Sequence, residues 1–353
     1  MKKSPFIIIM FSLLAAMSPA ASTSATQSKL RENVPAVIWE NPSEIRSRDL
    51  YYGSGSQALA PAAPFEFLGE DKQGISPKFT VKDARDVEWS VKLGHEAQAE
   101  VAAMRLVWAV GYFTEETYYF ARVRINKLPR LSRGEEYVEK GGVVRGVRFE
   151  SRRSEVERGE YWAWSKNPFV GTRQLDGLRV LMIMLNNFDV KTANNRVLIV
   201  SDPQQAQREA RYVAADLGAS LVRAGGLGAK RSKNNVEDFA SSRFVLGVED
   251  GMVDFDYHVR PTGFAWAMVA YPPVFLKQWA NGKAMADVPV AHARWIGGHL
   301  ARLTSAQLHD AFRAAEYDEA AKTAYVKALQ ERIEQLIQLP GAPNDLADVA
   351  RAP

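Results

Sequence analysis

Residues 172–188, TRQLDGLRVLMIMLNNF, are too apolar all round for a helix on a protein surface. A helix without a polar face must be buried against other elements, so this segment requires a sizeable core around it. The chain can supply that core, because it has 353 residues, of which 46% are hydrophobic and 24% charged. That composition is ordinary for a globular protein and predicts one large domain or two lobes.

A polar loop, NNFDVKTANN, follows the buried segment and precedes the apolar run RVLIV. Asp189, Lys191 and Asn194 have D-x-K-x-x-N spacing, which average residue frequencies produce in roughly a few per cent of chains this long. A plain surface turn explains the pattern. A phosphate-handling loop also explains it, because phosphoryl transfer depends mainly on positioning and charge neutralisation. In that case Asp189 accepts a proton, Lys191 neutralises phosphoryl charge and Asn194 binds a metal through its amide oxygen.

The hydrophobic pattern predicts an α+β protein. Before about residue 160, the alternation in KFTVKD, VEWSVKLG, YYFARVRINKL and GGVVRGVRFESR is typical of strands, and HEAQAEVAAMRLVWAVGY predicts one helix. Beyond that point the chain is mostly helical, with strands expected in RVLIVSD and QQAQREARYVAADLG. A last helical stretch begins at Thr304 or Ser305 as N-cap and stops at Pro340.

The N-terminus predicts export. Residues 1–25 contain a basic start, an apolar stretch too short for a comfortable membrane span, and small residues at candidate cleavage sites. We therefore expect a cleaved signal peptide and a periplasmic or secreted protein without a stable membrane anchor; an uncleaved anchor is the alternative. Residues 26–64, rich in Pro, Ala, Ser and Gly, predict a flexible lead-in.

Composition limits the other classes of function. The chain has no cysteine, which excludes a lipobox, structural disulfides and thiolate metal sites. The formal charge of +4 includes Lys2 and Lys3 in the predicted signal, so the mature chain carries about +2 (4 − 2). This small excess gives little support for a nucleic-acid partner, and we expect none.

Three further positions carry groups suited to nucleotide chemistry. Asp216 in VAADLG lies between strand-like residues and Gly218, so it can present a carboxylate to Mg²⁺ where the backbone turns, although such turns are common. Lys92 lies in the strand pattern EWSVKLG and points into a pocket or to solvent. Glu100, in the following helix, can pair with it. Glu96, one turn earlier, is the rival partner, and an exposed ion pair is the plainer interpretation.

Taken in order, VEWSVKL, Glu100, FDVKTANN and ADLG resemble the protein-kinase-like fold over roughly residues 65–310. The resemblance is closest to divergent bacterial and secreted members, such as the HipA-like kinases and the spore-coat or Golgi secretory kinases. It implies a β-rich N-lobe with one main helix at 65–160 and a larger, mostly helical C-lobe at 161–340. Residues 341–353 would be a tail.

The resemblance also implies roles in binding a nucleotide and a metal. Lys92 would contact the α- and β-phosphates of ATP or another nucleoside triphosphate, oriented by Glu100 or Glu96. Ser76 and Lys78, in GEDKQGISPKF, would stand where kinases have a glycine-rich phosphate loop.

The remaining implied roles concern catalysis and metal binding. Asp189 would be the catalytic base and Lys191 its helper. Asn194 and Asp216 would bind Mg²⁺ or Mn²⁺.

Several departures from the kinase pattern accompany the resemblance. Asn187 and Phe188 replace the usual His-Arg before the catalytic Asp, and Leu217 replaces the usual Phe. Asp216 follows Asp189 by 27 positions (216 − 189), which is longer than usual and marks SDPQQAQREAR as an insertion. There is no A-P-E motif, which puts recognition of a protein substrate in doubt.

Three hypotheses follow. The first is an exported kinase-like enzyme that transfers a phosphoryl group from a nucleoside triphosphate to an unknown acceptor. Because ATP is scarce outside the cytoplasm, another donor, nucleotidyl transfer or action inside a target cell stays open. The second is a non-catalytic pseudokinase scaffold, in which Asp189 is dispensable. The third is a globular protein with a coincidental loop, in which Lys92, Glu100, Asp189 and Asp216 do not converge. The oligomeric state is not predicted.

Overall fold

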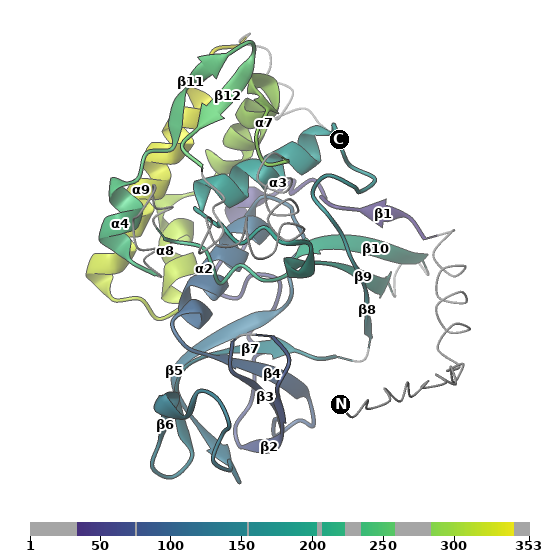
Figure 1. Cartoon of the computed structure of the whole chain (residues 1–353), viewed down its shortest axis with the longest axis vertical. Helices are drawn as coiled ribbons and strands as arrows, with labels where there is room; N and C mark the ends of the chain where they lie inside the picture. The colour runs from purple at the N-terminus through teal and green to yellow at the C-terminus, as the bar shows by residue number, and fades with distance from the viewer. Residues whose placement is uncertain are drawn as a thin grey trace, which may run out of the picture. The chain divides into compact units, whose positions relative to one another are not determined.

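The structure, a computed structural model, describes residues 34–74, 76–153, 155–202, 207–222, 234–257 and 284–341. The described residues from Ala36 onward belong to one compact unit. The described residues contain three β-sheets and six α-helices, which confirms the mixed α+β class (Figure 1). The boundary near residue 160 and the division into two lobes stay predictions.

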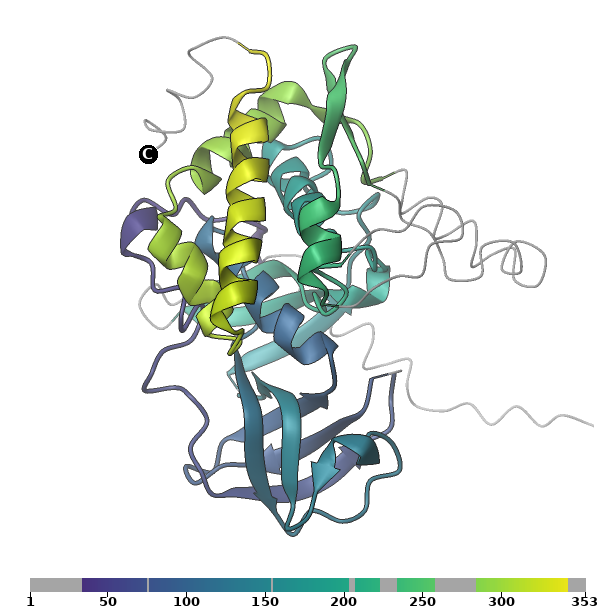
Figure 2. The same ribbon diagram turned by 90° about the vertical axis from the view of Figure 1, so that its left-hand side faces the viewer.

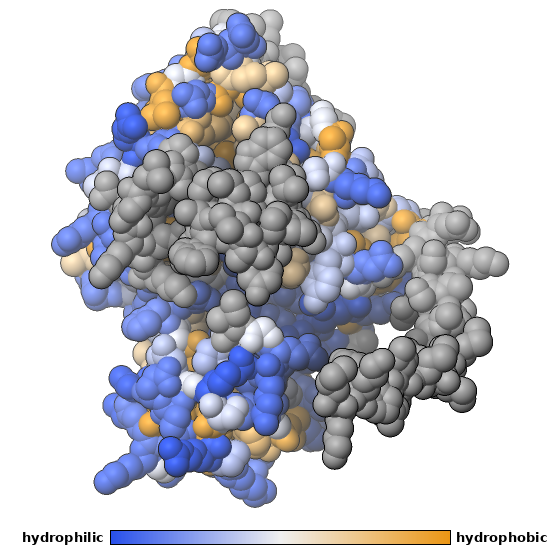
Figure 3. Space-filling model, in the orientation of Figure 1, coloured by the Kyte–Doolittle hydropathy of each residue, from blue (hydrophilic) through white to orange (hydrophobic). Residues whose placement is uncertain are grey.

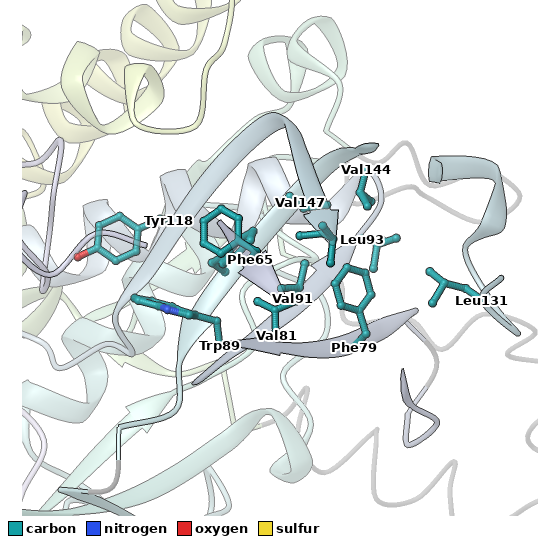
Figure 4. Packing of buried hydrophobic residues seen from close by; sticks show 12 residues of the cluster. Phe65, Phe79, Val81, Trp89, Val91, Leu93, Tyr118, Leu131, Val144 and Val147 are labelled. Carbon is teal, nitrogen blue, oxygen red and sulfur yellow. The ribbon is translucent and has the colours of Figure 1, made fainter. Parts of the chain in front are cut away.

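The first sheet closes on itself. Its strands are β2 (Phe65–Asp71), β3 (Lys78–Lys82), β4 (Glu88–Leu93), β5 (Thr117–Asn126), β6 (Val138–Glu139) and β7 (Val143–Ser151). They lie in the order β4-β3-β2-β5-β7-β6, and β4 also pairs with β7, so five of these strands form a closed ring. The interior is filled by aromatic and branched side chains that alternate along the strands, among them Phe79, Trp89, Val91 and Phe149 (Figure 4). The predicted strands of this region are therefore confirmed.

Helix α2 (Glu96–Ala109) covers one outer face of this closed sheet. It contacts β4, β5 and β7 on one side and α8 (Ser305–Arg313) on the other. Its small residues, such as Ala99 and Ala103, allow close approach on both sides and are fully buried. The predicted helix is confirmed, and its position places its polar residues against the sheet.

A second sheet joins distant parts of the sequence. Its order is β1 (Ala36–Val37), β10 (Gln207–Ala214), β9 (Asn195–Asp202) and β8 (Val156–Tyr161). Strands β9 and β10 pair antiparallel along their whole length, with Asn195 opposite Ala214. The described parts of the segment predicted as an insertion, residues 201–202 and 207–211, therefore belong to these two strands, which return the chain from the polar loop to the neighbourhood of Asp216.

The apolar segment 172–188 contains the buried helix α3 (Arg173–Met184), which confirms the prediction of a buried helix here. Thr172 caps it by accepting a hydrogen bond from the backbone N–H of Leu175. Helix α3 packs against α7 (Val290–Leu300), which in turn contacts α9 (Glu319–Ile337). The following polar loop is thus held by a rigid element.

The C-terminal helices begin as the sequence predicts. Thr304 forms a capping box with Gln307 at the start of α8. Helix α9 lies beside α8 and the short helix α4 (Val236–Ser241) (Figure 2). The expectation of mostly helical structure here was incomplete, because β11 (Val245–Glu249), β12 (Met252–Phe255) and β13 (Val288–Pro289) form a third sheet.

The surface over β11 and β12 carries exposed apolar side chains, visible in Figure 3. Leu246, Val248 and Met252 belong to this group. These residues alternate with polar ones, as a half-buried hairpin does, but the Gly and Asp residues around them resemble a loop in the sequence.

The expectation of a flexible lead-in was wrong for the part that the structure describes. Ile38, Ile45 and Leu50 are fully buried, and β1 pairs with β10. The side chain of Gln307 donates hydrogen bonds to the carbonyls of Ile45 and Arg48, at 2.8 and 2.9 Å. The Pro, Gly and Ser residues mark turns here, while isolated apolar residues between them anchor the segment to the core.

No helix among the described residues is long and apolar enough to cross a membrane. Residues 1–25, on which the prediction of export rests, lie outside the described residues. Export and localisation therefore stay predictions.

The burial of Ile45 in the segment around residues 36–50 can be tested by mutation. Ile45→Ala should lower the free energy of unfolding by about 2–5 kcal/mol, because it leaves a cavity at a fully buried position. The exposed neighbour Arg46 provides the control, and Arg46→Ala should stay within about 0.5 kcal/mol of wild type. Urea unfolding measures both; an Ile45→Ala midpoint equal to that of wild type would contradict the packing.

Candidate active site

Lys92 faces away from the interior of the closed sheet. Its neighbours Val91 and Leu93 point into that interior, and side chains alternate along a strand, so Lys92 lies on the outer face. Helix α2 covers this face immediately after β4 ends. The sequence therefore places a lysine ammonium group under a helix that carries Glu96 and Glu100.

Lys92 meets three carboxylates. Its Nζ lies 2.9 Å from Oε2 of Glu100, 3.1 Å from Oδ1 of Asp216 and 3.4 Å from Oε2 of Glu96. Of the two rival partners on α2, Glu100 is the nearer. The side chains of Lys92 and Glu100 are 3% and 1% exposed, whereas that of Asp216 is 47% exposed. The cluster thus has a buried side at Glu100 and an open side at Asp216.

The charges of this cluster stabilise one another. Burial alone would lower the pKa of Lys92, but the carboxylates of Glu100 and Asp216 outweigh it and raise that pKa above its ordinary value. Burial likewise acts to raise the pKa of Asp216, yet the charge and hydrogen bond of Lys92 lower it overall. Burial raises the pKa of Glu100. Because two cations contact it within 3 Å, we assign it as a carboxylate.

Arg148 is a member of the site that the sequence did not reveal. It lies directly opposite Lys92 across β4 and β7, and Lys78 lies opposite Lys92 on β3. Three basic residues therefore stand in a row on one face of the sheet. Directly opposed like charges repel, and Glu100 offsets this by contacting Lys92 through Oε2 and Arg148 through Oε1, at 2.8 Å.

A chain of buried ion pairs continues from Arg148. Its NH1 group also contacts Glu150, and Glu150 contacts Arg158, which contacts Glu115 at 3.2 Å. In sequence, Arg148 and Glu150 alternate with the apolar Val147 and Phe149, and Arg158 and Glu115 lie in polar stretches, so all four resemble solvated residues. Removing one partner from such a chain leaves a buried charge unpaired, which commonly costs about 3–5 kcal/mol.

The loop with D-x-K-x-x-N spacing has a defined geometry of its own. The Nζ of Lys191 lies 2.8 Å from Oδ1 of Asp189, and the backbone N–H of Asp189 donates to Oδ1 of Asn187 at 3.0 Å. The side-chain amide of Asn194 donates to the carbonyl of Asp189 at 2.6 Å. No hydrogen bond among the described residues uses the amide oxygen of Asn194, so this oxygen is available for a ligand.

Backbone hydrogen bonds tie this loop to Asp216. The carbonyl of Asn194 accepts from the N–H of Ala215 at 2.8 Å and from that of Asp216 at 3.3 Å. The pairing of β9 with β10 produces this junction, because Asn194 precedes β9 and Asp216 follows β10. Asp189 contacts no member of the Lys92 cluster directly; it is joined to it through Asn194.

Gly218 lets the chain pass close to Lys92. A Cβ atom at this position would lie 2.9 Å from the Nζ of Lys92 and 3.0 Å from the Cβ of Glu96. Any larger residue would push against the cluster. The glycine after Asp216 therefore serves the close approach of two segments.

Ser76 and Lys78 take different positions. The hydroxyl of Ser76 donates to Glu96 at 3.3 Å, which places the loop before β3 beside the cluster. Lys78 shares the face of Lys92, but its Nζ lies 3.7 Å from Asp71. The ion pair with Asp71 therefore accounts for the position of the Lys78 side chain without a bound phosphate.

The oxygen atoms of Asp216 and Asn194 suit a divalent cation that completes its coordination with atoms of a bound ligand. No group of three or more His, Asp or Glu side chains within the described ranges is arranged to hold a metal alone. Asp216 and Asn194 offer a half-exposed carboxylate and an amide oxygen, both hard donors of the kind Mg²⁺ and Mn²⁺ accept. Mg²⁺ commonly uses one or two such protein groups together with substrate phosphates.

Comparison with known proteins gives little further information. No family model matches the chain, and no curated protein matches it significantly. Among solved structures, a crystal structure of the Golgi casein kinase matches with 11% identity and a TM-score of 0.30, covering 94% of this chain and 93% of the other. The Golgi casein kinase with Mn/ADP bound matches with the same identity and score, over 93% of each chain. Scores this low do not establish a shared fold, and a closer relation to HipA-like kinases stays a prediction.

The buried chain predicts a pH dependence of stability. Burial, followed by the charge of Glu150, raises the pKa of Glu115 from 4.5 to about 7. The folded protein thus binds a proton more tightly than the unfolded chain, so the stability due to this group is present below pH 4.5 and lost as pH rises to about 7. Glu115→Gln, which mimics the protonated form, should remove this fall.

Urea unfolding at several pH values measures the difference between wild type and Glu115→Gln. The exposed Glu319 provides the control, and Glu319→Gln should parallel wild type. A wild-type minus Glu115→Gln difference that is constant across this pH range would contradict the assignment.

Proposed function

We propose that this chain is an exported, kinase-like protein that transfers a phosphoryl group from a nucleoside triphosphate to an acceptor, with Mg²⁺ or Mn²⁺ as cofactor. The observation that carries the proposal is the meeting of Lys92, Glu100 and Asp216, three residues that a motif comparison selected from separate parts of the sequence. If the D-x-K-x-x-N loop had arisen by chance in an unrelated globular protein, there would be no reason for these three side chains to lie together.

The excess of negative charge at the open side supports a cation there. Glu96, Glu100 and Asp216 surround one ammonium group, and of these three carboxylates Arg148 contacts only Glu100. A divalent cation held by Asp216 and Asn194 would supply charge neutralisation to the phosphates.

The roles of the protein side chains follow from their positions. Lys92, held in place by Glu100 and Arg148, would donate hydrogen bonds to phosphate oxygens. Asp189 is partly exposed and lies next to the metal-side residue Asn194, so it would accept the proton of an acceptor hydroxyl. Lys191, which contacts Asp189, would stabilise charge on the transferred group.

The finer parts of the proposal concern architecture and location. We assign residues 65–160 and 161–340 to the two lobes of a kinase-like fold, with the closed sheet and α2 in the first. We also propose a periplasmic or secreted location, which the signal-like pattern of residues 1–25 supports.

A pseudokinase scaffold is the alternative, and one observation favours it. The ammonium group of Lys92 contacts Oδ1 of Asp216 directly, so this oxygen is already occupied before any metal or nucleotide binds. A protein that uses this ion pair only to hold its parts together would keep it closed.

Calorimetry with ATP, in the presence and absence of Mg²⁺ or Mn²⁺, distinguishes these functions. We expect metal-dependent binding that Asp216→Asn weakens by about tenfold or more, because a ligand carboxylate is lost. Asp189→Asn should retain binding and lose phosphoryl transfer or ATP hydrolysis. Asp310→Asn, at a surface ion pair with Arg313, is the matched control and should bind as wild type does.

Circular dichroism must show that each variant is folded. Failure of the folded wild-type protein to bind any nucleoside triphosphate would rule out the enzyme. Nucleotide binding by a wild-type protein that shows neither phosphoryl transfer nor ATP hydrolysis would favour the scaffold, whereas activity that Asp189→Asn leaves unchanged would contradict the assignment of Asp189 as the base.

A further inference from the structure

A cavity of about 530 Å³ lies apart from the candidate active site. Its walls come from the N-terminal segment 40–48, the turn 108–116 after α2, the start of β8, and the strands β9 and β10. None of Lys92, Asp189 or Asp216 lines it. Its volume is within the range of small-molecule sites, which is about 300–1,000 Å³.

One wall of the cavity is aromatic and aliphatic. Trp108, Tyr112 and Phe113 follow one another closely at the end of α2, and Leu198 and Val200 of β9 also line the cavity. Such a wall favours the apolar body of an organic ligand.

The polar part of the lining contains one guanidinium group that lacks an anionic partner. Four arginines line the cavity: Arg48, Arg153, Arg158 and Arg211. The last three are paired with Glu116, Glu115 and Glu209 respectively. The guanidinium of Arg48 forms no hydrogen bond or ion pair with any described residue; it stacks on Trp108, with its Cζ 3.9 Å from the ring centroid.

Two acidic residues on the rim, Glu40 and Glu44, raise the opposite hypothesis of a cationic ligand. Both are exposed, so water already solvates their carboxylates. Arg48 is half-buried, and burial lowers its pKa, offset only in part by the charge of Glu40. The unsatisfied charge that a ligand would stabilise most is therefore the guanidinium.

The lining also contains the buried hydroxyl of Ser151, which has no hydrogen-bond partner among the described residues. Another part of the lining is held in place before any ligand arrives, because Arg158 and Glu115 belong to the chain of ion pairs. Fixed polar groups reduce the entropy lost on binding. With a single unpaired cation among several acids, the site fits one negative charge better than the two charges of a phosphate.

We propose that this cavity is a binding site for a small organic carboxylate, with its carboxylate on Arg48 and its apolar body against Trp108 and Phe113. The proposal does not depend on nucleotide binding, since the cavity shares no residue with the groups assigned to phosphate or metal.

Four probes with one aromatic body and different head groups test the proposal on the purified protein. They are 3-phenylpropionate, 3-phenylpropanol, 3-phenylpropylamine and 3-phenylpropyl phosphate. Saturation-transfer NMR and calorimetry should show binding of the carboxylate with a dissociation constant of about 1 mM, typical of a ligand this small. The alcohol and the amine should bind at least about tenfold more weakly.

Variants at Arg48 locate the binding. Arg48→Met should weaken carboxylate binding by about tenfold or more, and Arg48→Lys should weaken it less, because it keeps the charge without the planar fork. Arg46→Met is the matched control, since Arg46 is exposed on the same helical turn and does not line the cavity. Melting curves show whether each variant is folded; if Arg48→Met is not, Arg48→Lys carries the test.

Four outcomes would overturn the proposal. The carboxylate does not bind the folded protein; the amine binds as well or better; 3-phenylpropyl phosphate binds more tightly than the carboxylate; or substitution of Arg48 in a folded protein leaves carboxylate binding unchanged.

Discussion

A lysine ammonium group removed from water must be paired, and in this protein the pairing of Lys92 holds the site together. With 3% of its side chain exposed, Lys92 loses nearly all its hydration, and three carboxylates replace it. Glu100 and Glu96 come from the helix that follows β4 directly. Asp216 comes from 124 positions away, so this one ion pair joins segments that are otherwise remote in the chain.

The cluster of carboxylates around Lys92 has a fixed, buried side and an accessible, half-exposed side. On the buried side, Glu100 is fixed between Lys92 and Arg148 and cannot move without leaving charges unpaired. On the open side, Asp216 is about half exposed and is also held through its backbone by Asn194. A ligand can therefore exchange with the contact at Asp216 while the contact at Glu100 stays in place.

The sequence predicts the parts of this site that lie at chemically unusual positions. We could recognise Lys92 as a lysine within a strand, Glu100 as an acidic residue on the helix that follows this strand, and Asp189 in a D-x-K-x-x-N loop after a buried helix. Arg148 and Glu150 were missed, because charged residues that alternate with apolar ones are usual on a solvated strand face, and Arg158 was missed because it lies in the polar run VERGEY. Only the closure of β4 onto β7 and the cover of α2 show that this face is buried.

The fold was predicted best where periodicity is strong, as in α2, α3 and the strands of the closed sheet. It was predicted least well where buried residues are isolated between turns, as in the segment around Ile45, and where a hairpin contains Gly and Asp, as in β11 and β12. In those places tertiary packing, rather than local pattern, determines the structure.

A crystal structure of the protein with Mn²⁺ and ADP tests the central claim most directly, because the anomalous signal of manganese locates the metal. The account predicts a manganese peak within coordination distance of Asp216 and Asn194, a diphosphate oxygen in contact with Lys92, and an unchanged contact between Lys92 and Glu100. A structure in which Lys92 and Asp216 stay paired while Mn²⁺ and ADP bind elsewhere would contradict it.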